Sequence, residues 1–184
     1  MPLPHLLANP HSTVTVLNLV FAAPPAPREL HPPGFGYLVP RPEEGGESAS
    51  GLLGVVFDTA SLPGQDEGRF IKMSAMLGGP YASSSSSSSS ALLASALPLI
   101  SAQLGGADPL PEPVHYAVHR NVECIPTYLV GHTARMKELR RALRERWGGR
   151  LKVVGAGVGG VSIADCVKAG RQAGHQVAAH IEAE

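Results

Sequence analysis

Short runs of apolar and β-branched residues, separated by loop-forming segments, dominate the first two thirds of the chain. Runs of this length, bounded by Gly and Pro, predict strands rather than helices. The strands are expected at residues 13–21, 35–39, 52–57, 69–77 and 114–119, in one mixed or antiparallel sheet. The first of them consists almost entirely of β-branched and apolar residues, so we expect it to be buried on both faces.

Apolar residues at helical spacing become prominent towards the end of the chain. Residues 91–104 predict a helix that is kinked or split at Pro98, because proline lacks a backbone N–H. Residues 135–147 predict a clearer helix, which is rich in strong helix formers and is followed by two glycines. A short strand at 151–154 and a helix from 161 to about 179 complete the pattern.

These elements predict an α+β fold in two parts. Residues 1–132 would form the sheet, with a flexible serine-rich insertion at 82–90, because a run of serines buries no apolar surface. Residues 133–184 would form a helix followed by a strand, a glycine-rich loop and a terminal helix.

Composition excludes several classes of protein. Fifteen basic and fifteen acidic residues give a formal net charge of zero, whereas a general nucleic-acid binder needs an excess of Lys and Arg. Two cysteines cannot build a disulfide scaffold. The sequence contains no apolar run of the roughly 18–20 residues that a membrane span requires.

Two groups of residues could have a function, but each also has a simpler explanation as ordinary surface residues. His115 and His119 share one face of a predicted strand, but a zinc site needs a further ligand nearby, so solvated histidines are favoured and no metal is expected. Four of the five arginines in the helix at 135–147, namely Arg140, Arg141, Arg144 and Arg146, could attract an anionic membrane surface or simply face water.

Gly155, Gly157 and Gly160 match the G-x-G-x-x-G pattern of dinucleotide-binding turns. The full pattern also needs a second parallel strand with an acidic residue about 20 positions further on, and none follows here. A glycine-rich backbone at the start of a helix still offers N–H groups and a positive dipole end to a phosphate or a developing anion. Tight packing of that helix on a sheet is the alternative. A second glycine pair, Gly34 and Gly36, indicates either a hairpin corner or a wall against which a flat ligand lies.

Six ordered segments, spread over roughly residues 14–177, carry a resemblance to a known family. They are GFGYLVP at 34–40, LGVVFD at 53–58, MLGG at 76–79, CIPTY at 124–128 with GH at 131–132, GVSIADCV at 160–167 and AGRQA at 169–173. In this order they resemble the C-terminal portion of oxygen-dependent protoporphyrinogen oxidases, which are flavoproteins of the FAD-containing amine-oxidase superfamily. The resemblance implies that the sheet belongs to a substrate domain and that the last strand–helix unit completes an FAD-binding, Rossmann-like domain.

The resemblance also implies a reaction and a set of contacts. The family oxidises protoporphyrinogen IX to protoporphyrin IX, passing hydrides to FAD, which O2 reoxidises with release of hydrogen peroxide. The implied substrate contacts are Gly36, Leu38 and Met76, and the implied FAD contacts are Gly160, Val161, Ser162 and Ile163. No catalytic side chain is expected, because the chemistry belongs to the cofactor.

Two hypotheses therefore stand side by side. The chain is either a C-terminal piece of such an enzyme, inactive when isolated, or a non-catalytic remnant or scaffold that keeps part of the fold without FAD. The family's location implies peripheral association with the mitochondrial inner membrane, or alternatively a plastid, and a homodimer when the protein is full length. Without its sheet neighbours the last unit should expose Val153, Val154, Ile163 and Val167.

Overall fold

The structure is a computed structural model, and it describes residues 3–25, 29–40, 51–65, 68–78, 88–105 and 109–182. The chain divides into two compact units, Thr13–Val122 and a second unit made of Met1–Ser12 with Glu123–Glu184. The division differs from the boundary expected after residue 132, because residues 1–12 and 123–132 group with the C-terminal helices. The roles assigned to the two parts from the resemblance stay predictions.

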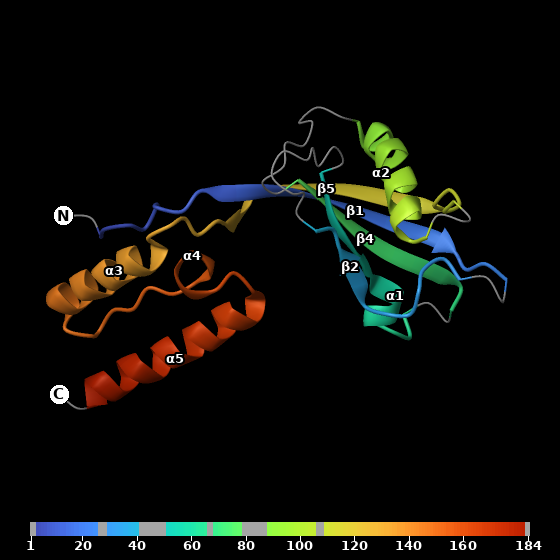
Figure 1. Cartoon of the computed structure of the whole chain (residues 1–184). Coiled ribbons are helices and arrows are strands. Elements are labelled where there is room, and N and C mark those ends of the chain that lie inside the picture. Colours follow the sequence, from blue (N-terminus) through green and yellow to red (C-terminus); the bar gives the residue numbers. More distant parts are fainter. Residues whose placement is uncertain are drawn as a thin grey trace. The chain divides into compact units, whose positions relative to one another are not determined.

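One antiparallel sheet of five strands confirms the α+β fold (Figure 1). The strands are β1 (His11–Ala22), β2 (Gly36–Leu38), β3 (Leu52–Phe57), β4 (Phe70–Gly78) and β5 (His115–Pro126), arranged in the order β2-β3-β4-β1-β5. Each lies where the sequence predicts a strand, although β5 runs seven residues beyond the expected end at 119. A one-turn helix, α1 (Asp58–Ser61), follows β3 directly.

The core of the sheet-bearing unit lies on one face of the sheet. Leu17, Leu19 and Phe21 of β1 are buried there with Met73, Ala75 and Leu77 of β4. Helix α2 (Ser89–Gln103) covers this face and contributes buried Ala96 and Ile100 (Figure 1).

Burial of β1 on both faces is a wrong prediction, because its even-numbered residues Val16, Asn18 and Val20 are only half-buried. They lie on the side of the sheet opposite α2, which we call the open face. Among the residues that strand alternation and register place on the open face are Val16, Asn18, Val20, Gly36, Leu38, Gly54, Val56, Lys72, Ser74 and Met76.

The start of α2 corrects part of the prediction for the serine run. Ser88 is the N-cap, its Oγ accepting a hydrogen bond from the Ala91 N–H at 3.2 Å, and Ser89 and Ser90 are already helical. Serine is a favoured N-cap, so the end of the run starts a helix rather than extending a loop. The earlier serines lie outside the described residues. The helix continues through Pro98, so it is not split there.

The second unit contains α3 (His132–Trp147), α4 (Ala156–Gly159) and α5 (Ile163–Glu182). Its small apolar core consists of Met136, Leu139 and Leu143 on α3, against which Val153 and Val158 pack. Residues 151–154 are not a strand, contrary to prediction, since a strand needs a partner for its backbone groups and the described residues of this unit give them none.

Helix α5 has no buried residue. Val154, Ile163 and Val167 are exposed, as predicted, but Val153 is partly buried against α3. The start of α5 differs from expectation in two ways: the helix begins at Ile163, two residues after Val161, and the glycine loop before it contains the short helix α4. None of the described helices has the length and apolarity needed to cross a membrane.

Candidate functional site

Two of the predicted substrate contacts lie in one row across the open face. Leu38 pairs with Gly54 and Gly54 pairs with Met76, so the three residues occupy adjacent positions on β2, β3 and β4. Val16 of β1 pairs with Met76 and extends the row. Neighbouring strands lie about 4.8 Å apart, which separates Leu38 from Met76 by roughly 10 Å. Leu38 is 86% exposed and Met76 37% exposed, so both side chains are available to a ligand.

Gly54 leaves bare backbone between these two side chains. A Cβ at this position would lie 2.5 Å from the Tyr37 carbonyl oxygen and 3.2 Å from Cδ2 of Leu38. No larger residue fits, and the Leu38 side chain leans over the gap. The sequence prediction missed Gly54 as a site residue. A glycine inside an apolar strand, which often marks a close approach, is the signal that could have found it.

Gly36, the third predicted substrate contact, lies in the next row of the open face, where it pairs with Val56. Its φ is +150°, and a Cβ there would lie 2.2 Å from the Val55 carbonyl oxygen. The glycine is therefore required for β2 to pair with β3, but it lies at the end of that pair away from the connection between the two strands, so it is not a hairpin corner. It leaves bare backbone on the open face, and its role as a wall for a flat ligand stays a prediction.

A chain of hydrogen bonds runs along this second row, in which Val56 pairs with Ser74 and Ser74 with Asn18. It was not predicted from the sequence. The Asn18 Nδ2 group donates to Ser74 Oγ at 2.7 Å, and Ser74 Oγ donates to Asp58 Oδ2 at 2.7 Å. Asn18 and Ser74 are register partners on β1 and β4, whereas Asp58 is the first residue of α1. The open face thus presents an apolar row beside a polar one.

Tyr37 holds β2 to the core from the other side. Its ring lies 6.2 Å from that of Phe57 in a tilted arrangement, and burial raises the pKa of its hydroxyl to about 12. The hydroxyl is buried without a hydrogen-bond partner in the described part of the chain. Alternation along the strand then directs Gly36 and Leu38 to the open face.

The predicted cofactor contacts follow a glycine loop that three side chains of the second unit hold in place. The Tyr128 hydroxyl accepts from the Gly160 N–H at 2.9 Å and donates to the Ala156 carbonyl. Its ring stacks on His132 with centroids 3.9 Å apart. Asn9 Nδ2 donates to the Gly157 carbonyl at 2.7 Å. The CIPTY and GH segments of the resemblance therefore supply anchors for the loop.

The start of α5 is capped by its own side chains. Ser162 Oγ accepts from the Asp165 N–H at 3.0 Å and donates to Asp165 Oδ2 at 2.7 Å. Because its single hydroxyl proton is given to Asp165, Ser162 can donate a hydrogen bond to a ligand only from its backbone N–H. The Asp165 carboxylate also lies against Gly160, where a Cβ would be 2.6 Å from Oδ2. That negative charge offsets the helix dipole, so this helix start suits a phosphate or an anionic ring less well than expected.

The segment 160–163 offers exposed apolar side chains and backbone N–H groups, which suit the neutral edge of a heterocycle. Val161 and Ile163 are 50% and 84% exposed. Within the described residues, the Val161 and Ser162 N–H groups donate no hydrogen bond. Exposed donors beside apolar side chains match a ring that carries carbonyl acceptors, such as the pyrimidine edge of a flavin. The structure thus brings together the four predicted cofactor residues, and separately the three substrate residues, each within its own unit.

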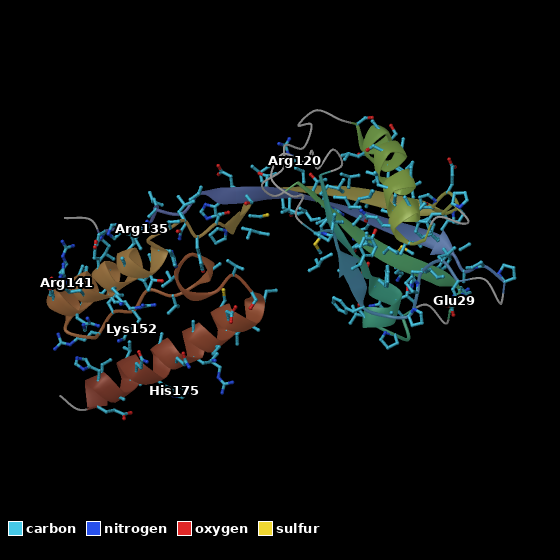
Figure 2. All side chains as sticks on the ribbon, viewed as in Figure 1. Glu29, Arg120, Arg135, Arg141, Lys152 and His175 are labelled. Atoms are coloured by element: carbon cyan, nitrogen blue, oxygen red, sulfur yellow. The ribbon has the colours of Figure 1, made fainter. Side chains whose placement is uncertain are left out.

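A hollow of about 450 Å³ in the second unit does not coincide with those four residues. Basic side chains on α3 and after it, Arg140, Arg144 and Lys152, contribute to its wall, and Gly159, which precedes Gly160 in the chain, also lines it. Arg141, labelled in Figure 2, does not line the hollow: its side chain faces solvent, with Nε 3.7 Å from Oε1 of Glu145. His115 and His119 are both exposed, and the described residues contain no cluster of three metal-binding side chains.

Comparison with known proteins bears directly on the resemblance. No protein-family model matches the chain. Proteins named protoporphyrinogen oxidase from Macaca fascicularis and Homo sapiens are 34% and 32% identical to it, each over 88% of this chain and 32% of their own length. The Bos taurus protein of that name is 31% identical over 93% of this chain and 35% of its own length. The chain therefore spans about a third of the length of these relatives.

A solved structure supports the fold. A candidate protoporphyrinogen oxidase from Exiguobacterium sp. 255-15 matches 98% of this chain and 37% of its own, with a TM-score of 0.69 and 19% identity. The α+β fold is thus shared with that protein. The resemblance seen in the ordered motifs is confirmed: over most of its length, the chain is similar to about a third of a protoporphyrinogen oxidase.

Proposed function

We propose that the chain forms the substrate-binding sheet, and the closing segment of the FAD site, of an enzyme that oxidises protoporphyrinogen IX to protoporphyrin IX. The observation that carries the proposal is the register of the open face. Leu38 and Met76, which the family resemblance assigns to the tetrapyrrole, flank the bare backbone of Gly54 in one row, with Gly36 in the next. An apolar ledge with a backbone floor suits a broad ring system.

The residues of this chain would bind and orient rather than transfer protons. Leu38 and Met76 would exclude water from the edges of the tetrapyrrole, and bare backbone at Gly36 and Gly54 would allow its approach. The backbone N–H groups of Val161 and Ser162 would hold an acceptor edge of the flavin. FAD, when bound, supplies the hydride acceptor and the route of electrons to O2.

A chimaera tests the proposal. The matching third of the Homo sapiens protoporphyrinogen oxidase is replaced by this chain, and flavin absorbance and porphyrin fluorescence are recorded on the purified protein. We expect bound flavin and porphyrin formation. Leu38→Ala should raise KM about tenfold, because it removes apolar contact with the substrate in ground and transition states alike. Leu7→Ala is the matched control, since Leu7 is 98% exposed in the other unit.

Each readout separates the hypotheses. A folded chimaera that holds flavin but forms no porphyrin would contradict the oxidase function and favour the scaffold alternative. A folded chimaera without flavin would contradict the cofactor assignment. Gly160→Leu provides the corresponding variant, because a side chain at Gly160 would collide with Asp165, and its flavin content should fall.

A further inference from the structure

We propose that Asn18 is a specificity-determining residue of the open face, which presents its amide oxygen to an inner N–H group of a metal-free tetrapyrrole. The inference rests on the proposed function and adds to it a residue that would favour a metal-free tetrapyrrole over its metal complex. It starts from the hydrogen-bonded chain of Asn18, Ser74 and Asp58, which the apolar ledge itself does not need.

Asp58 sets the direction of this chain. A carboxylate oxygen can only accept hydrogen bonds, so the Ser74 hydroxyl must give its single proton to Asp58 Oδ2, 2.7 Å away. Ser74 Oγ is then left as an acceptor, and the partner at 2.7 Å on Asn18 must be the donating Nδ2 group. The orientation of the Asn18 amide therefore follows from proton counting along the chain.

With Nδ2 turned towards Ser74, the amide oxygen Oδ1 occupies the other arm of the Asn18 side chain. In the described part of the chain Oδ1 accepts no hydrogen bond. Asn18 is half-buried between Val16 and Val20 on the same face of β1. Asparagine is depleted in strands, and an acceptor partly withdrawn from water gains most from a ligand that donates to it.

The position of Asn18 matches the ledge. Its register partner Ser74 is two residues from Met76 on β4, so Asn18 lies one row, about 7 Å, from the apolar row. A tetrapyrrole resting on Leu38 and Met76 carries its N–H groups at the centre of the ring, a few ångströms from its edge. A metal ion in the ring replaces those protons, so an acceptor at Asn18 would distinguish the metal-free ring from its metal complex.

The experiment compares free-base protoporphyrin IX with its nickel(II) complex, which lacks inner N–H groups and binds axial ligands weakly. Each is titrated into the 184-residue chain, and the dissociation constant is taken from porphyrin absorbance. The chain should prefer the free base by about tenfold, the worth of one hydrogen bond. Asn18→Leu and Ser74→Ala should abolish the preference while leaving binding of the nickel complex unchanged.

Val20→Leu is the matched control, because Val20 lies on the same face of β1 and carries no acceptor. It should change the affinity for both porphyrins equally. The inference is overturned by an unchanged preference in Asn18→Leu, by a wild-type chain without preference, or by an equal loss of preference in Val20→Leu. A chain that binds neither porphyrin also overturns it, whereas the proposed function is then still judged by turnover of the chimaera.

Discussion

The Tyr37 hydroxyl is buried beneath β2 and has no hydrogen-bond partner among the described residues. A buried polar group without a partner costs about 1–3 kcal/mol, while the ring itself packs usefully beside Phe57. Tyr37→Phe should therefore raise the free energy of unfolding by about 1 kcal/mol in urea denaturation at neutral pH. Tyr116→Phe, at another tyrosine packed against the same core, is the control and should bring no comparable gain.

The same hydroxyl gives the variant a distinct pH dependence. Burial raises the pKa of Tyr37 from 10.0 to about 12 in the folded chain, so the unfolded chain releases this proton first as pH rises. The stability that the folded chain gains by keeping this proton is fully present below pH 10 and is lost as the pH rises towards 12. In urea titrations between pH 10 and about 12, the free energy of unfolding should fall less for Tyr37→Phe than for the wild type. Parallel curves would contradict the assignment.

Pairing of β2 with β3 depends on glycine at positions where a side chain would clash with the neighbouring backbone. A Cβ at Gly54 would stand 2.5 Å from the Tyr37 carbonyl oxygen, which belongs to backbone and cannot move aside cheaply. Gly54→Ala should therefore cost about 1–3 kcal/mol of unfolding free energy and speed amide exchange at Val39, which donates to Leu53. Gly174→Ala is the matched control, because a Cβ there meets nothing within 4 Å on α5. An equal effect of both substitutions would refute the close-approach argument.

Elements that rest on local pattern could be predicted from the sequence, and elements that rest on distant partners could not. The apolar runs that became β1, β3 and β4 were visible because a run of β-branched residues favours extended backbone wherever it lies. The run at 151–154, which is also rich in apolar residues, is not a strand, since strand formation also needs a neighbour. Ser88 caps α2 through a local hydrogen bond, but in a run of eight identical serines the sequence does not show which one is the N-cap.

The candidate site divides along the same line. Gly36, Leu38 and Met76 were available from motifs, because motifs are local. Their alignment, and the contact between Asn18 and Ser74, depend on a register between strands 56 residues apart. A one-residue slip would move every one of these side chains to the other face, so only the folded sheet could show the polar row.

The two units differ in how many apolar side chains each of them buries in its own core. The sheet-bearing unit buries side chains from β1, β3, β4 and α2 in one cluster, whereas the second unit buries Met136, Leu139 and Leu143 and leaves α5 without a buried residue. Hydrogen exchange followed by mass spectrometry should show slow exchange in β1 and β4 and fast exchange throughout α5, because local opening of α5 uncovers little. Peptides of α5 as protected as those of β4 would contradict this expectation.

The N-terminal segment of the second unit is also tied to distant positions. Asn9 bonds to Gly157 across 148 residues, and His5 bonds to Glu138 across 133. The sheet-bearing unit, by contrast, is one continuous stretch, Thr13–Val122. On a ribosome, that stretch emerges whole and can close its core while the partners of Asn9 are still unmade. The segment that contains His5 and Asn9 is thus made before the sheet but meets its partners only after it, and a nascent chain arrested just after Val122 would carry a finished sheet preceded by a segment still without its contacts.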